Sequence, residues 1–143
     1  MGEPSTCATP GVLVCAQLPD PRCHQPLPDG STVSQNVNYL RQMAGAQQPY
    51  AIPFYTWLRN VWSGGAWDYK TTGLPGMEAM GNFNYGATAT VFFGPLTIQS
   101  GAGVAQLMFN PGESSGGIPF FTSPYGDAAD DVPFVLAGIS GGC

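Results

Sequence analysis

The chain has 143 residues, a length that suits one domain with a single core and is too short for two. It contains 20 glycines and 14 prolines, only 9% of its residues are charged, and its formal net charge is −5. This composition excludes a coiled coil, which needs many charges and few helix breakers, and a protein that binds duplex nucleic acid through a basic face. Apolar residues make up 43% of the chain, enough to build a core, which argues against intrinsic disorder.

The N-terminal segment, residues 1–28, is rich in proline and cysteine, and we expect an irregular arm there, followed by a catalytic domain over 29–143. The apolar run at 12–16 is too short for the core of a signal peptide, and no run approaches the roughly 20 residues that cross a bilayer. We therefore predict no membrane span. The odd start after Met1 suggests a domain excised from a longer protein, with its export signal elsewhere.

Four cysteines favour two disulfides, because an even number in a small, Gly- and Pro-rich chain is typical of proteins from an oxidising compartment. Free thiols in a reducing cytosol are the alternative. Three pairings are open, and a bond from the last residue to the N-terminal group would close nearly the whole chain. No C-x-x-C spacing points to zinc. The cysteines are Cys7, Cys15, Cys23 and Cys143.

The first two helices are predicted by spacing and caps. A turn and N-cap at 29–31 precede a helix that ends at Gly45, and a second helix covers 51–62 with Pro53 in its first turn. Both segments repeat apolar residues at helical spacing. In the first helix these are Val33, Val37, Leu40 and Ala44.

The middle of the chain is ambiguous. Residues 77–80 suit a helical turn, 81–86 a structured loop or short strand, and 88–93 either a helix or a strand. Pro95 opens a helix through Phe109, residues 110–126 form a Gly/Ser/Pro loop, and a last helix covers 129–138. We therefore predict a mainly α fold: one compact helical domain with long loops, or, as an alternative, an α+β fold with a short β-hairpin.

Several kinds of chemistry are excluded by what the chain lacks. Its single histidine, His24, is adjacent to Cys23, and adjacent side chains rarely converge into a nucleophilic pair. A paired-histidine ribonuclease site and a histidine-rich metal site are impossible. There is no phosphate-binding glycine loop, and the Gly-Ala-Gly at 101–103 is interpreted as close helix packing. We expect no metal and no cofactor.

The sparse carboxylates are the first candidates for catalysis. Glu78 is flanked by methionine and phenylalanine, a setting that would raise its pKa by desolvation, as a general acid requires. Asp68 lies between two aromatic residues, and Lys70 follows to hold it ionised. Two carboxylates in unlike settings are the minimum for hydrolysis of a glycosidic bond. The structural alternative is an Asp68–Lys70 surface pair, a solvated Glu78 and an Asp127 that caps a helix.

Aromatic residues beside amides form a second candidate set. Aromatic faces stack on sugar rings and amides make paired hydrogen bonds to them, so the segment suits a sugar or a glycopeptide. Alternatively, the aromatic residues belong to the core and the asparagines occupy left-handed turn positions. The candidate substrate-binding residues are Trp67, Asn82, Asn84 and Tyr85.

Several blocks in a fixed order resemble the polymorphic toxin type 44 domain, and the resemblance covers roughly 27–139. The blocks are LPDGS at 27–31, VWSGGAWDYK at 61–70, GNFNYGAT at 81–88, GAG at 101–103 before Gln106, and YGD at 125–127 followed by Asp130.

The chain departs from the family pattern at three points. Of the family's Tyr-Glu-Asp-Phe block only Glu78 matches, Ala89 replaces a glycine, and Ala128 replaces an aspartate. The residues that keep the pattern are Asp68, Lys70, Glu78, Asn82, Asn84, Tyr85 and Asp127.

The resemblance implies an antibacterial toxin or effector, secreted or delivered into a target cell, with a cognate immunity protein as its partner. We favour a peptidoglycan hydrolase acting in the periplasm, with Glu78 as general acid, Asp68 positioning water and Lys70 orienting Asp68. One alternative is a metal-independent ribonuclease, in which Lys70 stabilises the phosphorane and Asp68 or Tyr85 transfers protons on RNA. The other is a non-enzymatic binding module of a secreted assembly.

Overall fold

The computed structural model describes residues 18–46 and 51–143, without the side chains of Ala46, Ala51, Lys70 and Thr71. Within these residues it has five α-helices, and the one β feature is an isolated bridge between Ile118 and Thr122. The mainly α prediction is confirmed, and no β-hairpin strand forms in the described part. The helices are α1 (Val33–Ala46), α2 (Ala51–Val61), α3 (Met77–Ala89), α4 (Pro95–Phe109) and α5 (Val132–Ser140).

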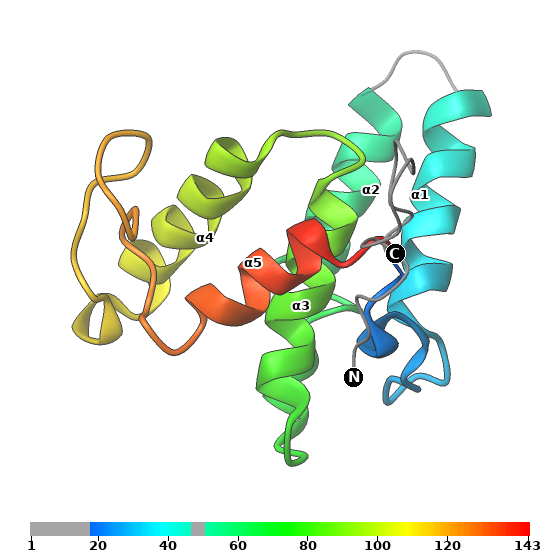
Figure 1. Ribbon diagram of the computed structural model, residues 1–143, viewed down its shortest axis with the longest axis horizontal. Helices are drawn as coiled ribbons and strands as arrows, with labels where there is room; N and C mark the ends of the chain where they lie inside the picture. The colour runs from blue at the N-terminus through cyan, green and yellow to red at the C-terminus, as the bar shows by residue number, and fades with distance from the viewer. Residues whose placement is uncertain (1–17, 47–50) are drawn as a thin grey trace, which may run out of the picture.

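Helix α3 runs through the middle of the fold, and α5 crosses it, with α1 and α2 on one side and α4 on the other (Figure 1). Two glycines make this crossing close. A Cβ on Gly86 would overlap the carbonyl oxygen of Val135, and a Cβ on Gly138 would overlap the carbonyl oxygen of Phe83. The two helices therefore meet backbone to backbone, which only glycine permits.

The core lies between α1, α2, α3 and α5. Phe83 of α3 and Val135 of α5 are almost fully buried, and Trp57 of α2 belongs to the same core, where its Nε1 donates to Thr88 Oγ1 (3.0 Å). Burial of an aromatic side chain of this size stabilises a fold by about 2–3 kcal/mol. From α1 the core takes Val33, Val37 and Leu40.

A disulfide joins Cys23 to Cys143 across 120 positions of sequence. Cys23 belongs to the short 3-10 helix η2 (Pro21–His24), so this part of the predicted irregular arm is regular and lies against the core. Beside the bond, the backbone N–H of Asp20 donates to the carbonyl of Gly141 (2.7 Å). The predicted disulfide is confirmed for this pair, whereas Cys7 and Cys15 lie outside the described residues.

Three predicted segments need correction. Residues 81–86 are neither loop nor strand but the middle of α3, because close packing against α5 overrides the low helix propensity of their glycines and asparagines. Residues 90–92 form turns after α3 ends, so 88–93 is not a single helix or strand. The last helix begins at Val132 instead of 129, with Asp131 at its N-cap and no capping hydrogen bond from that side chain.

The boundaries of two helices match the prediction closely. Helix α4 covers the predicted 95–109, and α2 ends one residue before the predicted 62. Helix α1 extends one residue beyond Gly45. Across the described residues, the search for a helix long and apolar enough to cross a bilayer finds none.

Candidate functional site

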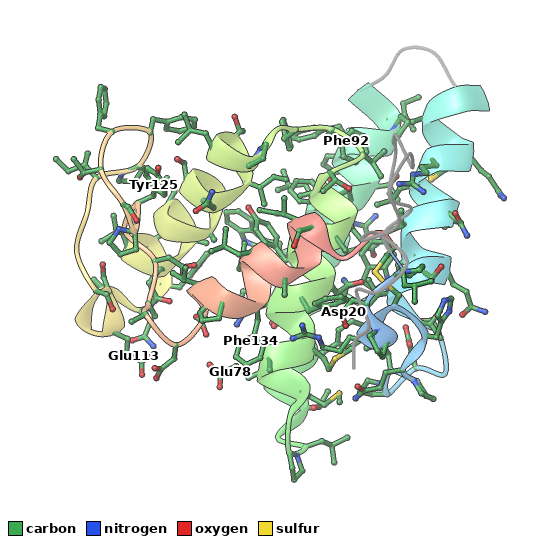
Figure 2. The ribbon with its side chains drawn as sticks, in the orientation of Figure 1. Asp20, Glu78, Phe92, Glu113, Tyr125 and Phe134 are labelled. Atoms are coloured by element: carbon green, nitrogen blue, oxygen red, sulfur yellow. A yellow bond between two sulfur atoms is a disulfide. The ribbon has the colours of Figure 1, made fainter. Side chains whose placement is uncertain are left out.

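An acidic cleft of about 400 Å³ opens where the N-terminal end of α3, the start of α5 and the short helix η4 (Pro111–Glu113) come together. Every ionisable residue among those that line it is a carboxylic acid. Figure 2 shows Glu78 and Glu113 at the same end of the molecule, far from Phe92. The lining residues are Glu78, Glu113, Ser115, Ala128, Ala129, Asp130 and Asp131.

Glu78 reaches the cleft because it lies in the first turn of α3, directly after the left-handed Gly76. Successive helix residues are rotated by 100°, so Met80 and Phe83 face the core while Glu78 is exposed. The apolar surroundings expected from its sequence neighbours are therefore absent, since those neighbours point the other way.

Asn82 lies one turn after Glu78 on α3 and holds a second acid of the cleft. Its Nδ2 donates to Asp131 Oδ1 (2.9 Å). The backbone carbonyl of Asp131 accepts from Phe134 and Val135 in the first turn of α5 (3.1 and 3.2 Å). Asn82 was a predicted substrate-binding residue, and in the structure it fixes the direction of a carboxylate.

The opposite wall of the cleft is tied together by backbone hydrogen bonds. The N–H of Ser115 donates to the carbonyl of Asp127 (2.9 Å), and the Oγ of Ser115 accepts from the N–H of Ala129 (2.7 Å). Asn110 donates from its amide to Glu113 and so fixes the rim. The wall is thus cross-linked between 113–115 and 127–129, which limits the reorganisation that a ligand would have to bring about.

Asp127 and Tyr85 lie behind this wall. Asp127 is 5% exposed, and its Oδ1 accepts from the N–H of Ala128, which lines the cleft. The hydroxyl of Tyr85 donates to the carbonyl of Ile98 (2.7 Å) and links α3 to α4. Burial, and to a lesser extent the charge of Asp127, raises the pKa of Tyr85, so its hydroxyl stays protonated and keeps this hydrogen bond.

Asp68 and Trp67 are part of the scaffold. Asp68 is 8% exposed, and its Oδ2 accepts from the N–H of Gly64 (2.8 Å), closing the turn after α2. Trp67 is buried in the core. Neither residue lines the acidic cleft. Lys70 lies in the 3-10 helix η3 (Tyr69–Thr72), and its side chain is outside the described part of the structure.

Asn84 lies in a buried polar network that joins three elements. Its Oδ1 accepts from Asn36 Nδ2 of α1 (3.0 Å), and the same nitrogen donates to the hydroxyl of Tyr69 (3.3 Å). The hydroxyl of Tyr69 in turn donates to Asp29 Oδ2 (3.4 Å). Burial raises the pKa of Tyr69. Asn84 itself is fully buried, so it cannot touch a ligand in this conformation.

The structure therefore separates the predicted site residues into two groups. Glu78 lines the cleft, Asn82 hydrogen-bonds to Asp131 of its lining, and the backbone of Asp127 supports its wall. The second group belongs to the scaffold: Trp67, Asp68 and Asn84 are buried and Tyr85 is partly buried.

Sequence reasoning missed Asp131 and Glu113. The contact between Asp131 and Asn82 spans 49 positions, so no local pattern signals it. Glu113 is in a Gly/Ser/Pro loop that was read as a connection. Among the described residues, no three His, Cys, Asp or Glu side chains converge closely enough to hold a metal ion.

Comparison with known proteins gives no relative: no family model, no curated protein and no solved structure matches this chain. The resemblance to the polymorphic toxin type 44 domain accordingly stays a prediction made from the sequence blocks.

Proposed function

We propose that this chain is an antibacterial toxin domain that hydrolyses the glycan strands of peptidoglycan. The observation that carries the proposal is the cleft in which Glu78 and the Asn82-held Asp131 line one cavity. Hydrolysis of a glycosidic bond needs two carboxyl groups on opposite sides of the bond, one as proton donor and one beside the anomeric carbon. A cleft of about 400 Å³ is large enough to hold a sugar unit.

In the proposed reaction, Glu78 protonates the oxygen of the leaving sugar as the C–O bond breaks, and the bound sugar supplies the desolvation of Glu78 that its sequence neighbours do not. A water molecule attacks the anomeric carbon, and Asp131 accepts its proton and stabilises the positive charge that develops there. Asn82 keeps Asp131 in the orientation that this step requires. The second carboxylate is thus Asp131, whereas Asp68, the partner expected from the sequence, closes a turn elsewhere.

The charge of the cleft favours a glycan over RNA. Its ionisable lining residues are all acidic, and such a surface repels the phosphates of a nucleic acid. The Cys23–Cys143 disulfide supports an oxidising place of action such as the periplasm, because cytosolic reductants keep thiols reduced. The sequence resemblance adds the expectation of an immunity protein.

The test is digestion of purified sacculi, with new reducing ends and released fragments as the readout. The wild-type chain is expected to release fragments, and Glu78→Gln to release at least about 100-fold less, since general acid catalysis contributes about 10²–10⁴-fold. Glu113→Gln is the matched control: the same change at the rim, where Asn110 already holds the carboxylate, is expected to leave most of the activity. Intact sacculi after long incubation with wild-type protein would contradict the proposal.

The place of action is tested by expression in a bacterium with and without a periplasmic export signal. The proposal expects growth arrest and lysis only with export. Toxicity in the cytosol, accompanied by RNA degradation, would instead favour the ribonuclease alternative.

A further inference from the structure

A second cavity, the aromatic groove, lies outside the acidic cleft and takes no part in the proposed reaction. It has a volume of about 390 Å³ and is formed by the C-terminal half of α2 and the turn after it. The residues that line it are Tyr55, Leu58, Arg59, Trp62, Ser63, Gly64 and Gly65.

Two aromatic side chains of the groove are exposed. Tyr55 is 61% and Trp62 43% exposed, and they are seven positions apart, which places them on the same side of α2 and its last turn. The ring of Phe109, at the end of α4, packs edge-on against Trp62 with centroids 5.3 Å apart. The indole is thus fixed in place and still accessible, as a platform for a flat or ring-shaped ligand requires.

The floor of the groove is a rigid turn. The N–H of Gly65 donates to the carbonyl of Trp62 (2.7 Å), and the N–H of Gly64 to Asp68 Oδ2 (2.8 Å). A Cβ on Gly65 would overlap the carbonyl oxygen of Arg59, so the backbone at position 65 lies closer to the end of α2 than any residue with a side chain would allow. Buried Asp68 therefore fixes the turn that forms the floor of the groove. Because this surface is already ordered, a ligand that binds to it pays little conformational entropy to order the protein.

Arg59 supplies the one charge among the residues that line the groove. It is exposed, and no carboxylate of the described residues pairs with it. A guanidinium presents a planar fork of donors that matches a carboxylate in a two-bond geometry. A cation that pairs with no carboxylate of the described residues, beside two accessible aromatic rings, indicates a ligand with an anionic group next to a ring.

We infer that the aromatic groove is a binding subsite for a carboxylate-bearing sugar, whose ring stacks on Trp62 and Tyr55 while its carboxylate pairs with Arg59. The inference rests on the proposed function and adds to it a preference for glycan units with a free carboxylate, such as N-acetylmuramic acid from which the stem peptide has been removed. The groove is physically linked to the cleft: Phe109 contacts Trp62, and the chain then continues through Asn110 to Glu113 on the cleft rim.

A nucleic acid is a poorer occupant. One guanidinium neutralises one phosphate, and a chain of net charge −5 with an acidic cleft nearby repels the rest of a polyanion. A sugar unit with a single carboxylate needs only the one cation that the groove provides.

The experiment is a titration of the 143-residue chain with the Glu78→Gln change, which is expected to fold and to bind ligand without cleaving it. Tryptophan fluorescence and calorimetry measure the binding. The probes are N-acetylmuramic acid, a neutral N-acetylglucosamine trimer, a galacturonic acid oligomer and a single-stranded oligonucleotide. Tighter binding of N-acetylmuramic acid than of the neutral trimer supports the inference. Preference for the galacturonic acid oligomer also supports a carboxylated sugar, but from a source other than the bacterial wall.

Two variants and two matched controls locate the binding. Arg59→Gln is expected to weaken N-acetylmuramic acid binding about tenfold or more and to leave binding of the neutral trimer unchanged, because it removes a charge-assisted hydrogen-bond pair. Trp62→Ala is expected to weaken both. Arg41→Gln makes the same change as Arg59→Gln, and Tyr39→Ala likewise removes an exposed aromatic ring; both positions lie on α1, and both controls are expected to leave binding of the two sugars unchanged.

The inference is overturned if Arg59→Gln behaves like Arg41→Gln, or if the oligonucleotide binds more tightly than every sugar. Its failure is distinguishable from that of the proposed function. A wild-type chain that binds the acidic sugar at the groove but leaves sacculi intact supports the subsite and contradicts the hydrolase. A chain that digests sacculi with Arg59→Gln fully active and fully able to bind contradicts the subsite alone.

Discussion

Helix α3 carries two polar stripes with different surroundings. The cleft stripe consists of Glu78 and Asn82, which face the acidic cavity and Asp131. The buried stripe consists of Asn84 and Thr88, both fully buried and hydrogen-bonded to α1 and α2. Within each stripe the residues are four apart, and the six positions between Glu78 and Asn84 rotate the stripes about 120° from each other.

The difference between the stripes separates function from scaffold within one sequence block. A buried amide bonded to other protein groups stabilises the fold, whereas an exposed carboxylate in a cavity is available to a ligand. Substitutions in the buried stripe should therefore change stability, and those in the cleft stripe should change activity. A change at the crossing of α3 and α5 should disturb both stripes.

Gly138→Ala should produce the largest loss. The new methyl group would overlap the backbone of Phe83 and push α5 away from α3, at a cost of about 3 kcal/mol or more of unfolding free energy. Both the melting temperature and the activity should fall, since Asp131 moves with α5. Chemical denaturation and the sacculus assay measure the two effects. Gly45→Ala is the control: its Cβ meets nothing within 4 Å, so stability should be unchanged or higher. Equal effects at the two positions would contradict the close crossing.

Asn84→Ala should lower the unfolding free energy by about 1–2 kcal/mol, because Asn36 loses a buried acceptor. Activity per folded molecule should stay close to that of the wild type. Asn38→Ala, at an exposed position of α1, is the control and should change neither quantity. If Asn84→Ala were as stable as the wild type but inactive, Asn84 would belong to the site after all.

Asn82→Ala should lower activity about tenfold, equivalent to about 1.4 kcal/mol in the barrier, because Asp131 loses the amide that orients it. The melting temperature should change by much less than in Asn84→Ala. The rate on sacculi and a thermal melt check both parts. Unchanged activity would show that the orientation of Asp131 does not matter to the reaction.

Asp20→Asn should have the smallest effect. The hydrogen bonds from Arg22 hold the pKa of Asp20 below its ordinary value, so this pair adds stability above that ordinary value and loses it as the pH falls toward the lowered pKa. The variant should cost well under about 1 kcal/mol at neutral pH, as is usual for a solvent-accessible pair. The difference from the wild type should shrink in melts below about pH 4. A difference that grew on acidification would contradict the assignment.

Much of the helical architecture was predictable, because it depends on local signals. Helix α4 starts at Pro95 and α2 carries a regular apolar stripe, so both were predicted closely. The centre of α3 was not, since its glycines and asparagines disfavour a helix until α5 packs against them. The pairing of Cys143 was one of several open choices until the structure joined it to Cys23.

Only those parts of the candidate site that depend on a single residue could be predicted from the sequence. Glu78 was found because carboxylates are scarce in this chain. The partner expected for it, Asp68, lies outside the cleft and closes a turn, whereas Asp131 lines the cleft and is held by a contact across 49 positions. Such contacts follow from helix packing and leave no mark in the local sequence.

The most direct test compares Glu78→Gln and Asn84→Ala in one experiment, with fragment release from sacculi and thermal unfolding measured on the same preparations. The two variants are expected to change activity and stability in opposite ways. Glu78→Gln should melt like the wild type and lose activity at least about 100-fold, whereas Asn84→Ala should melt earlier and keep its activity at temperatures where it is folded. A Glu78→Gln chain that melts like the wild type and digests sacculi at the wild-type rate would contradict the catalytic cleft.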